Sequence, residues 1–316
     1  NSDRFEPDTY LTDYFTDEAV KAIAANKDQP FFLYLAHWGI HTPLQATRQD
    51  FEAVGDNFPN HRTRVYAGMI RAIDRSVGRI MQALKDNGID DNTLIIFTSD
   101  NGGANYIGMP DINKPYRGWK LSFFEGGTHV PFVMRWPNRL KGGTTYPHAI
   151  SHLDIMPTAL GAASLSPQAE LIDGVNLLPH LSGQITARPH DSLIWREGHY
   201  QAILSDGWKM QRSGSPEKIR LFNLAEDPLE KNDLSATRSD KIAELDRGML
   251  LLREALADNQ VEHERLRIEA TDFLRMPFPG RNEAAFYLGQ SKSMFIITNS
   301  EQLAETVVKN HKSPKA

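Results

Sequence analysis

The sequence of 316 residues contains no cysteine. Within this chain, that absence excludes disulfide bonds, zinc sites built from thiolates and a cysteine nucleophile. The sequence also lacks an apolar run of the ~18 residues that a helix needs to span a bilayer, so we expect no membrane partner. The chain begins with the polar stretch Asn1-Ser2-Asp3-Arg4, which is unlike a signal peptide.

The sequence has little net charge for its length. Its 35 Lys and Arg against 40 Asp and Glu give a net charge of −5, which does not indicate a basic surface, and we expect no nucleic-acid partner. Hydrophobic residues make up 40% and charged residues 24%, as in ordinary soluble globular proteins. The length suffices for one large domain, or for one large and one small domain.

A short apolar run followed by a polar turn is the most informative stretch. Leu94 to Phe97 have the length and composition of a buried strand, and Asp100-Asn101-Gly102-Gly103 then predicts a sharp turn. Ligands of open α/β sheets usually bind beyond the carboxyl ends of strands, and Asp and Asn offer the oxygen ligands that Ca²⁺ or Mg²⁺ prefers. A plain turn is the alternative, since these residues favour one without any metal.

An earlier apolar run, Pro30 to Ala36, also has the length of a strand and precedes His37 and His41. Histidines just beyond a buried strand are candidates for anion binding or acid–base chemistry, with a structural role as the alternative. Before this run, Thr16-Asp17-Glu18 predicts the start of a helix that continues to about Ala25.

The stretch from His61 to Asn87 predicts a long amphipathic helix. Its apolar residues recur every three or four positions, and Gly88 follows as the expected C-terminal cap. We expect its arginines to form a solvated face (Arg62, Arg64, Arg71, Arg75 and Arg79). Strand, long helix and strand together make the βαβ pattern that favours a parallel sheet.

Downstream of the turn, Lys120 lies beside glycine-rich sequence, where an ammonium group could bind an oxyanion. A plain surface lysine is the alternative. A third apolar run extends from Val130 to Pro137, and Ser151 to Thr158 predicts another helix with Asp154 near its N-terminus.

The character of the sequence changes near residue 165. Short runs bounded by turns predict a small antiparallel sheet (Ser192–Trp195, Gln201–Leu204, Trp208–Gln211 and Ile219–Phe222). Lys241 to Leu256 predicts an amphipathic helix packed on that sheet, with partner binding as the alternative. For the end of the chain we expect a loop at Leu274–Arg281, a strand at Met294–Thr298, a short helix at Glu301–Lys309 and a basic tail.

Five segments resemble the type I sulfatase family of the alkaline phosphatase superfamily, in their order and spacing. They are Phe31–Gln45 (FFLYLAHWGIHTPLQ), Thr93–Gly103 (TLIIFTSDNGG), Arg117–Pro137 (RGWKLSFFEGGTHVPFVMRWP), His152–Thr158 (HLDIMPT) and Leu221–Asn232 (LFNLAEDPLEKN). Together they extend over about residues 10 to 256.

The resemblance implies roles for four residues. Asp100 and Asn101 would be two ligands of a Ca²⁺ ion, with Mg²⁺ as the other candidate cation. His41 would hydrogen-bond the sulfate ester or its leaving oxygen, and Lys120 would bind a sulfate oxygen. We expect structural roles for His129 and Glu125. His37, in the same HWGIH stretch as His41, is a weaker candidate for contact with the substrate.

Part of the family's site has no counterpart in this sequence. The family carries an N-terminal Cys- or Ser-x-Pro-x-Arg motif whose first residue becomes formylglycine, and neither form of the motif occurs here. An Asp-Asp pair, a further Lys and a further His at the metal and sulfate are also missing. We therefore expect the chain to be the C-terminal two-thirds of a sulfatase, needing a separate N-terminal half, self-association or a rearranged sheet to cover its apolar edges.

The resemblance implies an α/β fold. We expect an alkaline phosphatase-like sandwich with a mostly parallel central sheet flanked by helices, plus a smaller C-terminal α+β domain with an antiparallel sheet. The expected divisions are residues 1–165 for part of the catalytic domain, 166–260 for the small domain and 261–316 for an extension of unknown role. Export to the periplasm or the medium follows from the resemblance alone.

The leading functional hypothesis is metal-assisted hydrolysis of sulfate esters of carbohydrates or aryl alcohols. A phosphodiesterase or phosphonate hydrolase of the same superfamily is the first alternative, because a metal and cationic ligands also suit phosphate. The second is a non-catalytic sulfatase-like module that binds an anionic glycan or a partner protein.

Overall fold

The computed structural model describes residues 7–165, 172–214 and 216–258, and further strand segments at 264–268, 271–278, 281–291 and 294–298. The predicted helix at Glu301–Lys309 and the basic tail lie outside the described residues. The chain divides into two compact units: one contains Glu6–Ile150 and Leu177–Ile242, and the other contains Asn1–Phe5, Ser151–Asn176 and Ala243–Ala316. We call the first of these the larger unit; no helix in the described part of the chain is long and apolar enough to cross a membrane.

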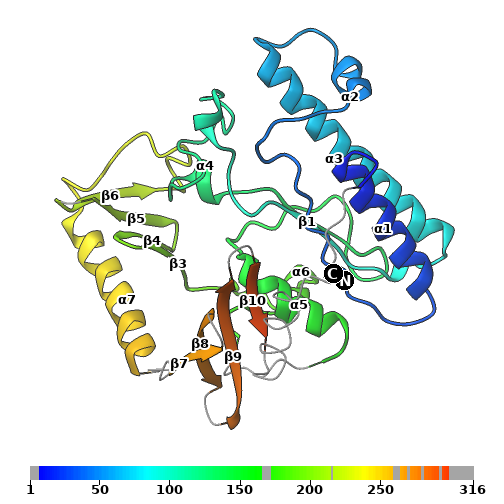
Figure 1. Ribbon diagram of the computed structural model, residues 1–316. Helices are drawn as coiled ribbons and strands as arrows, with labels where there is room; N and C mark the ends of the chain where they lie inside the picture. The colour runs from blue at the N-terminus through cyan, green and yellow to red at the C-terminus, as the bar shows by residue number, and fades with distance from the viewer. Residues whose placement is uncertain are drawn as a thin grey trace. The chain divides into compact units, whose positions relative to one another are not determined.

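Two helices pack side by side in the larger unit: α1 (Leu11–Asn26) and α3 (His61–Asp86) (Figure 1). Asp13 bonds Arg75 and Asp17 bonds Arg79, so contacting positions advance together along both helices and the helices run in the same direction. Ile23 packs against Ala83 and Leu84 at their C-terminal ends. The predicted α3 is confirmed: the Asn60 side chain caps its first turn, and Gly88 follows it with φ +69°.

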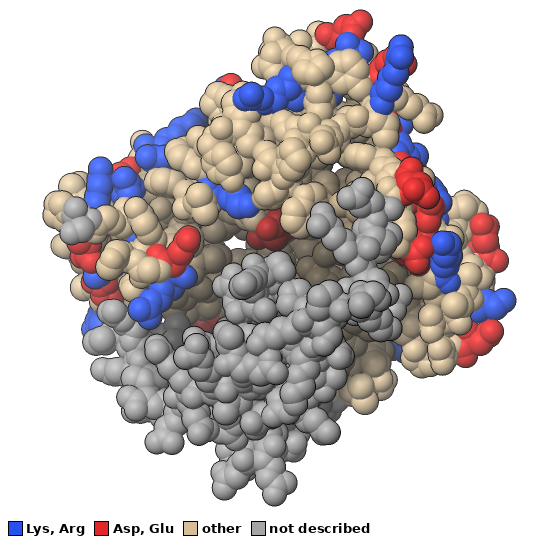
Figure 2. Space-filling view, viewed as in Figure 1, with Lys and Arg blue, Asp and Glu red and all other residues tan. Residues whose placement is uncertain are grey.

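The start of α1 differs from the prediction, and the α3 arginines differ from it in part. The helix begins at Leu11 and not near Thr16, because Thr16 is buried and hydrogen-bonds Ser76 of α3 instead of capping a helix. The predicted solvated face is confirmed in part, since Arg62, Arg71 and Arg79 are exposed, whereas Arg64 and Arg75 are half-buried. Arg71, Arg75 and Arg79 pair with carboxylates of α1 and of the short helix α2 (Arg48–Ala53), and Figure 2 shows basic and acidic side chains intermixed over this region.

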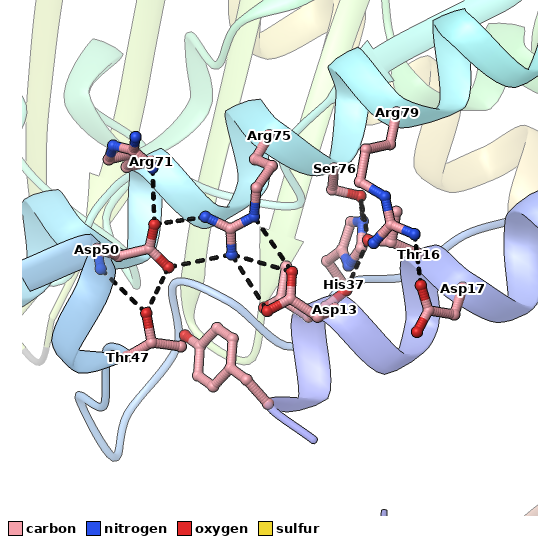
Figure 3. A network of polar contacts seen from close by, with 12 residues as sticks. Asp13, Thr16, Asp17, His37, Thr47, Asp50, Arg71, Arg75, Ser76 and Arg79 are labelled. Carbon is pink, nitrogen blue, oxygen red and sulfur yellow. Dashed lines mark hydrogen bonds and ion pairs between the residues drawn. The ribbon is translucent and has the colours of Figure 1, made fainter. Parts of the chain in front are cut away.

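Asp50 of α2 is the centre of this network, which Figure 3 shows from close by. Its side chain is 1% exposed and accepts hydrogen bonds from Arg71 at 2.9 Å, from the Arg75 Nη2 at 3.0 Å and from Thr47 at 2.7 Å. Burial favours the neutral acid, but the hydrogen bonds from Arg75, Thr47 and Arg71 outweigh it and lower the pKa of Asp50. The carboxylate therefore ties α2 to α3.

The predicted strand at Pro30 to Ala36 is not a strand in the structure. The segment is extended without regular hydrogen bonds, and Phe32 and Tyr34 are 69% and 81% exposed. A strand is stable only when its backbone pairs with a neighbouring strand, and none of the described strands pairs with this segment. The βαβ unit expected from it is therefore absent from the described residues.

The Leu94–Phe97 run forms β1 (Ile95–Thr98), which pairs antiparallel with β2 (Phe132–Arg135). Between them lie η2 (Asn105–Ile107) and α4 (Glu125–Thr128), and a 3₁₀ turn, η1 (Asp90–Asn92), precedes β1. The mostly parallel central sheet is not observed, since all strand pairs among the described residues are antiparallel.

The small antiparallel sheet is confirmed. Its strands pair in the order β3-β4-β5-β6, with bounds Ser192–Glu197, Tyr200–Ser205, Trp208–Ser213 and Lys218–Asn223. A short helix, α6 (Leu178–Leu181), precedes it, and α7 (Ser239–Asp258) follows it. The first turn of α7 lies against the sheet, because Lys241 Nζ is 5.7 Å from the centre of the Trp208 ring.

The other unit contains η3 (His152–Asp154), α5 (Ile155–Ala162) and four strands. The predicted helix at Ser151–Thr158 is confirmed, with Ser151 and Asp154 forming a capping box. The strands pair antiparallel in the order β10-β9-β8-β7, with bounds Met294–Thr298, Arg281–Ser291, Thr271–Phe278 and Glu264–Ile268. The predicted strand at 294–298 is confirmed, whereas most of the predicted loop at Leu274–Arg281 belongs to strands, because its residues pair with β7 and β9.

Candidate functional site

Two predicted site residues meet directly, although they lie far apart in the sequence. The Nζ of Lys120 is 3.4 Å from the Nε2 of His41. His41 is exposed and Lys120 is half-buried, so a ligand from solvent can reach both. Their nitrogens therefore converge on one accessible point of the surface.

The backbone fixes which nitrogen of His41 carries a proton in the neutral ring. Its Nδ1 lies 2.8 Å from the carbonyl oxygen of Thr42, which can only accept a hydrogen bond. Nδ1 therefore donates, and in the neutral ring Nε2 presents a lone pair toward the ammonium group of Lys120. When a proton binds Nε2, both groups become donors toward an anion.

Asp100 and Asn101 follow β1 in the turn that the sequence predicts. The amide of Asn101 donates to the carboxylate of Asp100, so the two side chains lie together. Gly102 N donates to the carbonyl of Gly127 at 3.0 Å, and a Cβ at Gly102 would overlap the carbonyl oxygen of Gly126. Glycine is therefore required at position 102 because two turns pack backbone to backbone.

Asn113 joins the same two turns. Its amide accepts from Gly103 N at 2.7 Å and donates to the carbonyl oxygens of Gly103 at 2.8 Å and Gly118 at 3.1 Å. The backbone N–H of Lys120 donates to the same Gly103 carbonyl at 3.2 Å. The structure thus holds the Asp100–Asn101 turn beside the turn that carries Lys120.

Asp100 and Asn101 offer the type of ligand atom that a hard cation binds, but too few of them to complete its coordination. A carboxylate and an amide oxygen are ligands of the type that Ca²⁺ binds, but Ca²⁺ takes six to eight oxygens. Rotating the Asn101 amide by half a turn would direct its oxygen toward Asp100, and amide orientation is assigned from such contacts. Among the described residues, no group of three or more His, Asp or Glu side chains is placed to hold a metal ion.

A buried cluster that the sequence did not reveal lies behind the Lys120 turn. Lys209 of β5 is fully buried, and its Nζ lies 2.6 Å from Glu125 Oε1 and 3.4 Å from Glu230 Oε1. Glu230 is also fully buried and accepts from the backbone N–H of Glu125 at 2.7 Å. Lysine is normally exposed, so the sequence gave no sign that Lys209 is buried. Glu230 lies in the Leu221–Asn232 motif, and that motif could have marked it as a candidate.

The pKa values of the two glutamates in this cluster are shifted in opposite directions. Burial raises the pKa of Glu230, and Lys209 offsets only part of that effect. Burial also acts on Glu125, but the hydrogen bond from His129 and the charge of Lys209 lower its pKa. His129 lies 2.7 Å from Glu125, and this hydrogen bond raises the pKa of His129.

His37 lies between the helices and anchors its segment to α3. Its Nε2 is 2.9 Å from Ser76 Oγ, which is 2.6 Å from Thr16 Oγ1 (Figure 3). Burial lowers the pKa of His37, so the ring favours its neutral form. These contacts support a structural role for His37 four residues before His41.

A pocket of about 400 Å³ adjoins His41. It is bounded by the loop after His41, the first turn of α3 and η2, and its walls include Thr42, Leu44, His61, Arg62, Tyr106 and Ile107. Arg62 is exposed and donates to the carbonyl oxygen of Ile107 at 2.6 Å, and the Tyr106 side chain is 60% exposed. The pocket therefore combines an aromatic ring with a cationic group next to the His41 loop.

Comparison with known proteins identifies the family of the chain. A family model described as Sulfatase matches residues 1–165, which is more than half of the chain. The chain belongs to the sulfatase family. The four predicted site residues, His41, Asp100, Asn101 and Lys120, lie inside the matched region.

Individual sulfatases match over part of their length. The chain is 38% identical over 198 residues to the uncharacterized sulfatase YdeN of Escherichia coli (strain K12), covering 62% of this chain and 35% of that protein. It is 38% identical over 186 residues to N-acetylgalactosamine-6-sulfatase of Canis lupus familiaris, covering 57% of this chain and 34% of that protein. The chain therefore spans about a third of the length of these relatives.

The sulfatase fold is also shared with solved structures. The crystal structure of Ps i-CgsB in complex with k-i-k-neocarrahexaose aligns with a TM-score of 0.72 and 34% identity. The alignment covers 80% of this chain and 56% of that chain. The α/β class expected from the sequence is thereby supported.

Proposed function

We propose that this sulfatase-family chain binds sulfate esters at the His41–Lys120 pair and takes part in their hydrolysis. The observation that carries the proposal is the 3.4 Å approach of these two nitrogens, from segments 79 residues apart. Side chains that converge from such distant segments define a site more specifically than either residue type alone.

The two side chains suit the two demands of a sulfate ester. The ammonium of Lys120 compensates negative charge on the non-bridging oxygens, which stabilises the transition state if it is held in position beforehand. His41 can act as a general acid in its protonated form: Nδ1–H stays bonded to the Thr42 carbonyl, and the proton on Nε2 passes to the leaving oxygen, which leaves the neutral ring. None of the described residues is assigned the role of nucleophile.

We propose Asp100 and Asn101 as two oxygen ligands of a Ca²⁺ ion, with Mg²⁺ as the alternative. The support is their donor type and their common turn, which the glycine contacts hold beside the Lys120 turn. A bound divalent ion would supply positive charge at the sulfate oxygens. Asp100 and Asn101 alone do not complete the coordination of such an ion, so the proposal requires further oxygen ligands.

We propose a sulfated carbohydrate as the substrate class. One relative is named for N-acetylgalactosamine 6-sulfate, and one structural neighbour was solved with a neocarrahexaose. The pocket beside His41 supports the same class, because the exposed ring of Tyr106 can stack on a sugar face and Arg62 can bind an anionic substituent. By family resemblance we also propose export.

The proposal is tested by hydrolysis of 4-nitrophenyl sulfate with Ca²⁺ present, beside 4-nitrophenyl phosphate, on the chain as it stands. Turnover of the sulfate above that of the phosphate, lost in Lys120→Met, supports a sulfatase. Faster turnover of the phosphate favours a phosphate-ester hydrolase. Absence of turnover with Lys120-dependent binding of the sulfate ester favours a binding module, and absence of both contradicts the proposal.

A further inference from the structure

The Lys120 turn is attached to the small sheet by a set of contacts that the proposed chemistry does not use. Arg117, the first residue of this turn (residues 117–125), donates to the carbonyl of Glu230 at 3.0 Å. Gln211 of β5 donates to the carbonyl of Phe123 at 3.3 Å, and the N–H of Glu125 donates to Glu230 Oε2 at 2.7 Å. The turn is therefore held on both sides of Lys120 by groups from β5 and from the Glu230 loop.

Lys209 is the centre of these contacts. Its ammonium has three protons and three acceptors: Glu125 at 2.6 Å, Glu230 at 3.4 Å and Thr128 at 3.4 Å. A fully buried lysine persists only where its charge is paired and hydrogen-bonded, which this geometry provides. Its partners lie on α4 and on the Glu230 loop, so the charge joins two segments that would otherwise repel through their carboxylates.

Local backbone geometry shows why the Lys120 turn needs such support. Leu121 has φ +75°, and its side chain is 68% exposed, so this left-handed conformation is not stabilised by packing of its own side chain. Gly118 has φ +89° at the start of the same turn. A turn with this backbone holds Lys120 in one place only when the surrounding structure fixes both of its ends.

We propose that Lys209, together with Glu230, is a positioning residue for Lys120. The cluster fixes the ends of the 117–125 turn and thereby keeps the Lys120 ammonium beside His41. This assigns a role to the Glu230 segment of the sequence, and it rests on the proposed function only in taking Lys120 as the anion ligand. Neither Lys209 nor Glu230 contacts the substrate in this assignment.

The test compares Lys209→Met, Glu230→Gln and Lys209→Arg with the exposed control Lys218→Met, which lies on β6 of the same sheet. Affinity for inorganic sulfate is measured by calorimetry, and backbone hydrogen exchange is measured over residues 117–129, well below each variant's melting temperature. Lys209→Met is expected to weaken sulfate binding about tenfold, as for loss of a charged hydrogen bond, and to accelerate exchange of the turn. Lys209→Arg restores both, and Lys218→Met changes neither.

A lysine that only stabilises the fold would lower the melting temperature, while the folded variant kept wild-type sulfate affinity and wild-type exchange in the turn. That result overturns the proposal. If Lys209→Met does not fold, Glu230→Gln decides: it keeps an acceptor for the Glu125 N–H, but removes the charge and the oxygen that faces Lys209 and Gln211. Unchanged exchange in that variant also overturns the proposal. If Lys120→Met binds sulfate as well as the wild type, the proposed function fails, and the exchange data still decide the positioning role.

Discussion

The Nζ of Lys120 lies 3.4 Å from the Nε2 of His41, and the carbonyl of Thr42 holds the opposite nitrogen of the same ring at 2.8 Å. The ammonium and the imidazole thus share one point at the surface. An anion bound there meets a fixed positive charge and a group that can carry a proton, which is the combination that sulfate-ester chemistry needs.

Asp100→Ala should abolish stabilisation of the chain by Ca²⁺. A ligand that binds only the folded state raises the free energy of unfolding by about 2.7 kcal/mol at a hundred times its Kd. Melting temperatures with Ca²⁺ and with chelator measure this effect. Asp111→Ala, which removes an exposed carboxylate paired with Lys114, is the matched control. An equal Ca²⁺ response in wild type and Asp100→Ala would rule out the metal assignment.

Gly102→Ala should destabilise the larger unit by about 1–3 kcal/mol or more, because the new methyl group overlaps the Gly126 carbonyl and separates the two turns. Gly78→Ala is the control, since a Cβ there meets nothing within 4 Å in the middle of α3. That substitution should stabilise the helix by up to about 1 kcal/mol. Urea unfolding measures both, and similar effects of the two substitutions would contradict the turn-on-turn packing.

Asp50→Asn should lower the free energy of unfolding by about 1–3 kcal/mol, because the buried side chain loses the charge that its hydrogen bonds from Arg71 and Arg75 depend on, while Arg75 keeps its pair with Asp13. Asp17→Asn breaks the exposed pair with Arg79 and should cost no more than about 1 kcal/mol. Chemical denaturation of both variants gives the comparison. Equal costs would show that burial of Asp50 does not set its importance.

His129→Gln should destabilise the protein in a pH-dependent way. The pKa of His129 is raised, so its contribution is present below the ordinary histidine value of 6.5 and is lost as pH rises through the raised value. The pKa of Glu125 is lowered, so its contribution is present above the ordinary value of 4.5 and is lost as pH falls through the lowered one. The pair therefore contributes most between these two ordinary values, by up to about 1 kcal/mol, since His129 itself is exposed.

Melting temperatures of wild type and His129→Gln across this pH range measure that contribution, with His199→Gln in the exposed turn after β3 as the control for the loss of a histidine. The difference between wild type and His129→Gln should shrink as pH rises through the raised pKa of His129. A difference that grows with rising pH would contradict the ion pair.

The boundaries of α3 and the strands of the small sheet could be predicted because their signals are local. Asn60 caps α3 and Gly88 ends it, and alternating runs bounded by turns mark β3 to β6. The direction of strand pairing could not be predicted, because nothing in the sequence of Ile95–Thr98 indicates that it pairs antiparallel with β2. Likewise, the run at 30–36 has strand composition, but a strand also needs a neighbour to bond.

Contacts between residues that lie far apart in the sequence could not be predicted. The ion pairs of the α3 arginines were not predicted, because their carboxylate partners lie on α1 and α2, 21 to 62 residues away. Lys209 was missed because lysine is seldom buried and its partners come from two other segments. The predicted site residues His41 and Lys120 were found through motif resemblance, and their contact was visible only once the turns were folded together.

The most direct test of the site is the affinity of the chain for 4-nitrophenyl sulfate in wild type, Lys120→Met, His41→Ala and the double variant, with the exposed Lys114→Met as the matched lysine control. Each single substitution at the site should weaken binding at least about tenfold. The double variant should lose less than the sum, because the two groups bind one anion. Wild-type affinity in Lys120→Met, or an equal loss in Lys114→Met, would contradict an anion site formed by His41 and Lys120.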